Sequence, residues 1–113
     1  MDLVVDVYRA TECFPRHETY GLAQQLRRAA VSIASNIAEG QARDHLGDYL
    51  HHLSIANGSL MELETQILIA GRLGYVGKER QTQILSRTAE AGRMLAGLSR
   101  ALRQRSRTHT PHR

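Results

Sequence analysis

Apolar residues recur at alternating three- and four-residue spacings in four segments of the 113-residue chain. No segment alternates apolar and polar residues as a half-buried β-strand does, so the pattern predicts an all-α protein. The first predicted helix runs from about Asp2 to Cys13 and stops before Pro15, which disfavours helical geometry in the residue that precedes it. Its apolar stripe is Leu3, Val7, Ala10 and Phe14.

The second and third segments carry longer stripes. The second predicted helix begins near Glu18 or Thr19 and stops at Gly40, because glycine suits the left-handed position that follows many helices. The third starts after Asp44, a favourable N-cap, and continues to about Gly71. Their stripes are Leu22, Leu26, Ala29, Ile33 and Ile37, and then Tyr49, Leu53, Ala56, Leu60, Leu63, Ile67 and Ala70.

A fourth stripe follows a connection that three glycines punctuate. Its members have heptad spacing and are Ile84, Thr88, Ala91, Leu95, Leu98 and Leu102. We expect this helix to end near Arg103 or Gln104, because nothing after residue 104 could anchor the chain to a core. The prediction is one domain, an antiparallel up-down-up-down four-helix bundle over residues 1–104, followed by a disordered basic tail over residues 105–113.

Positive charge is concentrated at the C-terminal end of the chain, although the net charge is only +4. Residues 1–98 contain ten basic and eleven acidic residues, whereas residues 99–113 contain five arginines and no acid. Guanidinium groups neutralise phosphates, so this region is a candidate for binding RNA or DNA without sequence preference. The candidate contacts are Arg100, Arg103, Arg105 and Arg107, with Arg43 as an addition. The alternative is a solubilising extension that has no ligand.

The sequence contains no pattern typical of an enzyme's active site. No glutamate is followed three residues later by histidine, which excludes the di-iron motif of four-helix bundles. The chain has one cysteine, and it lacks a Gly-x-Ser-x-Gly elbow and a glycine-rich phosphate loop. We therefore expect no catalytic residue, no metal site and no cofactor. We also expect a cytoplasmic protein without membrane contacts, because no apolar run is long enough to span a bilayer and the first residues are acidic.

Three polar residues lie where the helical wheel predicts burial. Asn57 and Glu64 project into the predicted core face of the third helix, and Asn36 lies at the edge of the second helix's stripe. We expect them to form a structural polar core that fixes the register of the helices. A buried carboxylate needs a partner, so Glu64 should meet an arginine, a tyrosine hydroxyl or free backbone N–H groups, and Arg27 and Arg28 are candidate partners.

Aliphatic residues also extend beyond the arcs that one bundle would bury. Val31 on the second predicted helix, and Ile55 and Ile69 on the third, lie outside the main stripes. Scattered exposed aliphatic side chains are normal on soluble proteins, whereas an interface between copies of the chain would cover them. The stripes alone leave both interpretations open.

Several stretches of the chain resemble a known family. Residues 14–22 (FPRHETYGL) and residues 25–40 (QLRRAAVSIASNIAEG) resemble the signature of the four-helix bundle proteins encoded in 23S rRNA intervening sequences. Residues 55–64 (IANGSLMELE) resemble the second block of that family, and residues 73–75 (LGY) its following turn. The family's first helix usually starts further upstream, and a start codon upstream of Met1 would account for that difference.

The resemblance implies an assembly and two candidate functions. Members of the family form a ring of five copies, and the family is similar to the accessory variability determinant of diversity-generating retroelements, which works with a reverse transcriptase and binds nucleic acid. We therefore expect a non-catalytic homopentamer that binds RNA or DNA. The alternative is a scaffold that docks a separately encoded enzyme, such as a reverse transcriptase, and has no direct role with nucleic acid.

Overall fold

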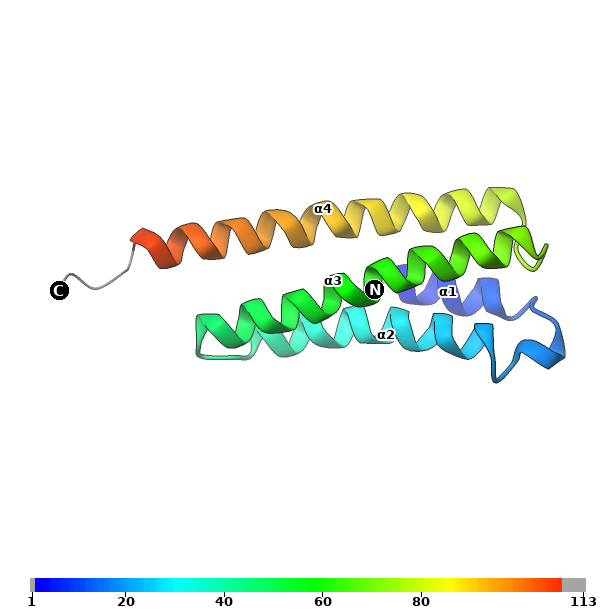
Figure 1. The fold of residues 1–113 in the computed structure, drawn as a ribbon, viewed down its shortest axis with the longest axis horizontal. Coiled ribbons are helices and arrows are strands. Elements are labelled where there is room, and N and C mark those ends of the chain that lie inside the picture. Colours follow the sequence, from blue (N-terminus) through cyan, green and yellow to red (C-terminus); the bar gives the residue numbers. More distant parts are fainter. Residues whose placement is uncertain (1, 109–113) are drawn as a thin grey trace.

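The computed structural model describes residues 2–108 of the chain, with side chains as far as residue 105. Helix α1 spans Asp2–Thr11, a 3₁₀ helix η1 spans Arg16–Glu18, and the long helices are α2 (Leu22–Gln41), α3 (Leu46–Arg72) and α4 (Lys78–Thr108). The described residues form no β-strand. Four helices in this order confirm the predicted all-α four-helix bundle (Figure 1).

Each helix packs against two others around one core. α1 contacts α2 and α4, and α3 contacts the same two helices. Ser32 and Asn36 of α2 pair with Ser59 and His52 of α3, respectively, so these two helices run antiparallel. Arg87 of α4 forms ion pairs with two aspartates of α1, which fasten the short first helix to the last.

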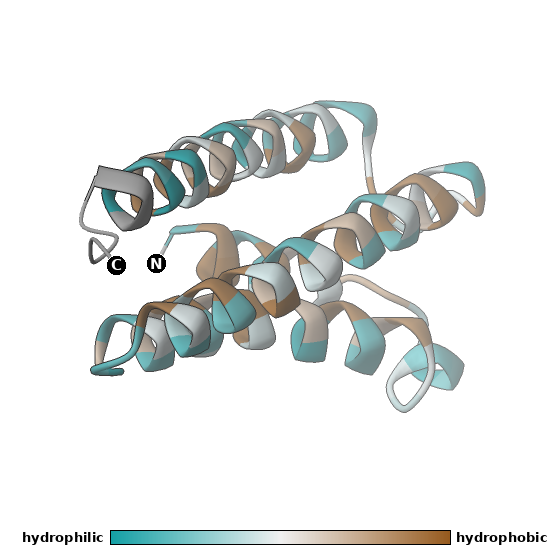
Figure 2. Cartoon of the chain, turned by 60° about the vertical axis from the view of Figure 1, so that its left-hand side comes forward, coloured by the Kyte–Doolittle hydropathy of each residue, from teal (hydrophilic) through white to brown (hydrophobic). Residues whose placement is uncertain are grey.

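The core consists mainly of residues from the stripes that the apolar spacing predicts. The stripe members that are only partly buried are Phe14, Leu22, Ile37, Tyr49 and Leu98. The α3 stripe from Leu53 to Ala70 is at most 2% exposed, and Ile84 and Leu95 of α4 are equally buried. In Figure 2 the hydrophobic positions gather where the helices face one another. Thr88 is fully buried in the α4 stripe, and its hydroxyl donates to a backbone carbonyl of the same helix at 2.8 Å, which satisfies the polar group.

The segment between α1 and α2 differs from the sequence prediction. α1 ends at Thr11 rather than Cys13, and the Thr11 hydroxyl donates to the carbonyl of Val7 at 2.9 Å. α2 begins at Leu22 rather than near Glu18, because Glu18 lies in η1 and its carboxylate accepts the backbone N–H of Leu22 at 3.1 Å. Glu18 therefore satisfies one of the free N–H groups at the start of α2 from outside that helix.

Gly40 does not end α2 in a left-handed conformation, contrary to the prediction. α2 continues to Gln41, and φ of Gly40 is not positive. Gly40 is buried, and a Cβ atom at this position would lie 2.9 Å from Cδ1 of Tyr49 and 3.2 Å from Cβ of His52. Glycine is needed here because α2 and α3 approach closely near their connecting turn.

The connection between α3 and α4 is the glycine-rich turn that the sequence predicts. Gly74 adopts φ of 77°, in the left-handed region that favours glycine. The backbone N–H of Tyr75 donates to the carbonyl of Ala70 at 2.9 Å, and the backbone N–H of Gly74 donates to the carbonyl of Gly71 at 3.1 Å. These two bonds form a Schellman motif, which satisfies the carbonyls at the end of α3 and turns the chain toward α4.

Two other helix ends differ from the prediction. The N-cap of α3 is His45 rather than Asp44, and no side chain caps this helix. α4 continues to Thr108, so the predicted boundary at residue 104 falls inside a helix and the disorder predicted for residues 105–108 is wrong. Arginine and glutamine are strong helix formers, and an existing helix extends at little cost. Residues 109–113 of the predicted tail lie outside the described residues.

α1 is short and covers only part of the length of the bundle. Figure 1 shows α1 beside the part of the bundle nearest η1. At the opposite end, which carries the α2–α3 turn, the described residues form three helices, and α4 projects past the turn (Figure 1). The protomer is elongated, with extents of 60 × 23 × 18 Å.

Candidate functional site

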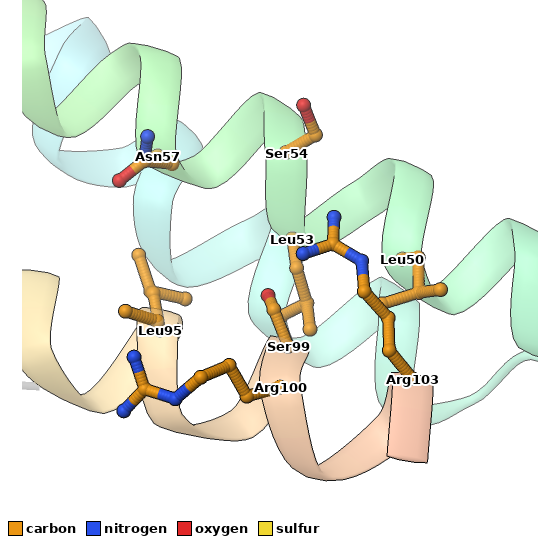
Figure 3. A pocket seen from close by; sticks show the side chains of 9 residues that line it. Leu50, Leu53, Ser54, Asn57, Leu95, Ser99, Arg100 and Arg103 are labelled. Atoms are coloured by element: carbon orange, nitrogen blue, oxygen red, sulfur yellow. The ribbon is translucent and has the colours of Figure 1, made fainter. Parts of the chain in front are cut away.

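Two of the candidate arginines line a groove of about 330 Å³ between α3 and α4. Arg100 and Arg103 project from α4, and Leu50, Leu53 and Leu95 supply the apolar surface of the groove. Figure 3 shows the Arg103 side chain reaching across the groove toward α3, while Arg100 extends along α4 toward Leu95. None of the residues that line the groove carries a carboxylate, so the local electrostatic potential is positive.

The other described candidates lie at the same end of the bundle. Arg43, in the α2–α3 turn, and Arg105 of α4 line a cavity of about 430 Å³. Arg43 also forms an ion pair with Glu39 at 3.2 Å, and Asp44 lines the same cavity, so its positive charge is partly neutralised. The side chain of Arg107 lies outside the described residues. Four of the five candidate arginines therefore gather around the α2–α3 turn and the last turns of α4.

Arg100 and Arg103 differ from Arg43 because their guanidinium groups have no polar partner. Neither makes a hydrogen bond or an ion pair with a described residue. Both side chains are exposed. A guanidinium carries five N–H donors in a fixed plane, so both groups are available to an anionic ligand.

Three neutral polar residues also line this groove, and the sequence analysis did not predict them as ligand contacts. Ser54 and Asn57 lie on α3, and Ser99 lies on α4. The hydroxyls of both serines have no partner among the described residues, and the Asn57 amide contacts only Met61 Sδ, at 4.0 Å. The sole sequence signal is that Ser54 and Asn57 follow Leu50 by four and seven residues, which places all three on one flank of a helix.

The predicted polar core of Asn57 and Glu64 is wrong. Asn57 is exposed at the α3–α4 groove, and Glu64 is half-exposed with no polar partner among the described residues. The guanidinium of Arg27, one expected partner of Glu64, instead donates to the Thr11 hydroxyl at 2.8 Å and stacks over the Tyr8 ring at 5.0 Å from its centroid. α3 turns its stripe toward α2 and α4 together, which leaves the Asn57 and Glu64 flank at the edge of the interface.

Asn36, the third residue of that set, does link two helices. Its amide nitrogen donates to the Ser32 carbonyl at 2.9 Å, and its amide oxygen lies 2.9 Å from Nδ1 of His52 on α3. Because the Asn36 oxygen can only accept, Nδ1 of His52 carries the proton. Nε2 of His52 then faces Glu39 Oε2 at 3.7 Å, and the Ser32 hydroxyl contacts that of Ser59 at 2.8 Å. This polar row fixes the register of α2 against α3.

A second polar cluster closes the opposite end of the bundle. The Tyr75 hydroxyl donates to the Glu18 carboxylate at 3.0 Å, and the rings of Tyr75 and Phe14 lie 5.4 Å apart. The hydrogen bond from Leu22 N–H, followed by that from Tyr75, lowers the pKa of Glu18 below its ordinary value of 4.5. Burial, together with the neighbouring Glu18 carboxylate, raises the pKa of Tyr75 above its ordinary value of 10.0. The cluster ties η1 to the α3–α4 turn.

We expect this cluster to make stability depend on pH. Because the pKa of Glu18 is lowered by folding, its stabilising contribution is present above pH 4.5 and is lost as the pH falls through the lower value in the folded protein. Because the pKa of Tyr75 is raised, its contribution is present below pH 10.0 and is lost above the folded value. Urea unfolding of the wild type and of Glu18→Gln as a function of pH checks this. The difference between them should shrink toward acid, and a difference that stays constant between pH 7 and acid contradicts the assignment.

The described residues hold no group of three or more histidine, cysteine, aspartate or glutamate side chains arranged to bind a metal ion. None of the described helices combines the length and the apolar character needed to cross a bilayer.

Comparisons with known proteins agree with this fold. The chain superposes on the crystal structure of a protein of unknown function from the S23 ribosomal protein family of Bacteroides thetaiotaomicron VPI-5482, with a TM-score of 0.81. The two share 20% sequence identity over 88% of this chain and 89% of the other, so the likeness concerns the fold alone. Among curated protein sequences, none matches the chain. The sequence model of the 23S rRNA-intervening sequence protein family matches residues 1–97. Because this match spans nearly the whole bundle, the chain belongs to the 23S rRNA-intervening sequence protein family.

Proposed function

We propose that this protein is a non-catalytic, homopentameric helical bundle of the cytoplasm that binds RNA or DNA through arginines at one end of each protomer. The observation that carries the nucleic-acid part is the α3–α4 groove. Arg100 and Arg103 line it without a carboxylate among the lining residues and without a polar partner in the described chain. Unpaired arginines in a positive groove are the chemistry that phosphate groups require.

The shape of the protomer supports assembly into an oligomer. Its radius of gyration is 16.4 Å, whereas a compact chain of this length has about 13 Å. Its accessible surface is 7532 Å², against about 6,200 Å² for a monomeric protein of the same mass. Val31, Ile55 and Ile69, the aliphatic residues outside the predicted stripes, are 41%, 39% and 44% exposed. Excess surface with exposed aliphatic side chains is typical of a subunit, and the number five comes from the family resemblance.

The nucleic-acid function predicts a strong dependence of affinity on salt. Binding of a labelled RNA or DNA should weaken steeply with salt, because each neutralised phosphate releases counterions. In Arg100→Ala/Arg103→Ala we expect affinity to fall about tenfold or more. The plot of the logarithm of the association constant against log salt should become less steep, its slope shrinking in magnitude by about 1.5. Filter binding or fluorescence anisotropy over a salt series measures both quantities.

A matched control uses arginines at the other end of the bundle. Arg72 and Arg80 are exposed beside the α3–α4 turn, so Arg72→Ala/Arg80→Ala removes the same charge without touching the groove. This control should bind nearly as well as the wild type. Equal losses in both double variants would show that only net charge matters and would remove the groove from the function. A chain that ends at Gln104 lacks Arg105, Arg107 and Arg113, and unchanged binding would favour the solubilising interpretation of the tail.

The second candidate function is a scaffold that docks a separately encoded enzyme. The observation that favours it is the apolar surface on α3, where Met61 and Leu68 are 61% and 50% exposed on the same flank as Asn57. Such side chains suit a protein partner better than a phosphate backbone. This function predicts a partner that stays bound in high salt and after nuclease treatment, whereas a nucleic-acid bridge would not survive either.

A further inference from the structure

The α3–α4 groove holds more than positive charge. Two guanidinium groups mark its rim, and three neutral hydrogen-bonding side chains, Ser54, Asn57 and Ser99, line it beside apolar surface. A site that recognises only phosphates needs the charges alone. The neutral groups are therefore the feature that the proposed function leaves unexplained.

The size of the groove sets what can enter it. A space of about 330 Å³ lies at the lower end of the range for small-molecule sites, about 300–1,000 Å³. It accommodates one nucleotide-sized group. The bases of a duplex are paired and stacked inside a convex cylinder, so a duplex can reach the rim arginines with its phosphates but cannot place a base in the groove.

The lining chemistry matches an unpaired base. The hydroxyls of Ser54 and Ser99 and the amide oxygen of Asn57 have no hydrogen-bond partner among the described residues, so they can bond to base edges. Leu50 is partly exposed and offers an apolar contact to the face of a base. Arg103 reaches across the groove toward Leu53 (Figure 3), which places a planar guanidinium where a base can stack on it.

We infer that the α3–α4 groove receives an unpaired base of a single-stranded nucleic acid, with Arg103 as the stacking plane, Asn57 and Ser99 bonding to the base edge, and Arg100 holding the adjacent phosphate. The inference rests on the proposed nucleic-acid function and adds a preference for single strands over duplexes. Aromatic platforms are absent from the described groove, so the affinity for each base is modest and the phosphate contacts dominate.

The experiment compares strand type and side-chain shape. Anisotropy with a fluorescein-labelled single-stranded RNA and with a fully paired duplex of the same length should give a dissociation constant at least about fivefold lower for the single strand at equal salt. Arg103→Lys keeps the charge and removes the stacking plane, so it should weaken single-strand binding about fivefold and change duplex binding less than about twofold. Asn57→Ala should act in the same direction. Arg72→Lys is the matched control, because Arg72 is exposed in the last turn of α3 and does not line the groove.

The possible outcomes separate the two proposals. A single-strand preference that Arg103→Lys abolishes, while Arg72→Lys preserves it, supports the groove as a base site. Equal affinity for single strand and duplex overturns the base site and leaves the electrostatic function standing. A single-strand preference that is unchanged in both Arg103→Lys and Asn57→Ala also overturns it, provided that circular dichroism shows both variants folded. No binding to either probe overturns the proposed function and the base site together.

Discussion

Replacing Ile67 by alanine should lower the free energy of unfolding by about 3 to 4 kcal/mol, the largest loss that we expect from a single substitution in this chain. Ile67 is fully buried on α3, the helix that packs against both α2 and α4. Removing its outer carbons leaves a cavity that two neighbouring helices would have to close together. A domain of this size is stable by only about 5 to 15 kcal/mol, so the variant should unfold at clearly lower urea concentration.

The matched control is Ile69→Ala, two residues away on the same helix. Ile69 is 44% exposed, so the same chemical change removes little buried surface within the protomer and should cost less than about 1 kcal/mol. Unfolding followed by circular dichroism at several protein concentrations compares the two. The loss for Ile67→Ala should not depend on concentration, because it arises inside one chain. At a dilution at which the protein is monomeric, equal losses for the two isoleucines would contradict the burial seen in the structure.

The core could be predicted from the sequence because the buried face of a helix repeats apolar residues every three or four positions. A residue such as Ile67 occupies a stripe position whichever helix packs on it, and the α3 stripe from Leu53 to Ala70 is buried as the spacing predicts. The same argument failed for Glu64. A helical wheel gives the angular positions of side chains around one helix only. The edge of the buried arc depends on where the neighbouring helices lie.

The spacing of apolar residues also could not predict where two helices approach each other closely or where a helix ends. Gly40 looked like a terminator, yet its role is to let Tyr49 of α3 lie against the backbone of α2, and this contact joins residues on different helices. The end of α4 was placed too early because apolar residues stop before Gln104, although helix propagation requires no apolar residue.

The candidate site was predictable in its charges and not in its shape. Arg100 and Arg103 stand out because an acid-free arginine cluster is visible in the sequence. The groove also needs Asn57, which lies on another helix and more than 40 residues away along the chain. Its exposure depends on how α3 packs against α4, and no local pattern encodes that packing.

The proposed ring requires each protomer to use two different surfaces, since a cyclic assembly of five is built from head-to-tail contacts. One candidate surface is the flank of α3 that carries Ile55 and Ile69, which lie nearly four helical turns apart on one side. The other is the outer edge of α1 and α2. There, Tyr8 lies under the Arg27 guanidinium at 5.0 Å, and Val31 follows Arg27 by one turn. All four apolar residues are about 40% exposed, so charges there should leave the protomer folded.

We therefore expect Ile55→Asp/Ile69→Asp and Tyr8→Asp/Val31→Asp each to abolish the ring. Light scattering should give about 63 kDa for the wild type and about 12.6 kDa for either variant alone. An equimolar mixture should give a heterodimer of about 25 kDa, because each variant retains the surface that the other has lost and the chain of contacts stops after one pair. A two-fold dimer would behave differently, because it uses one and the same surface on both copies. The variant whose substitutions lie on the other surface would then still form the dimer. A wild type of 12.6 kDa at every dilution would contradict assembly altogether, and a mixture that stays monomeric would place the interface elsewhere on the bundle.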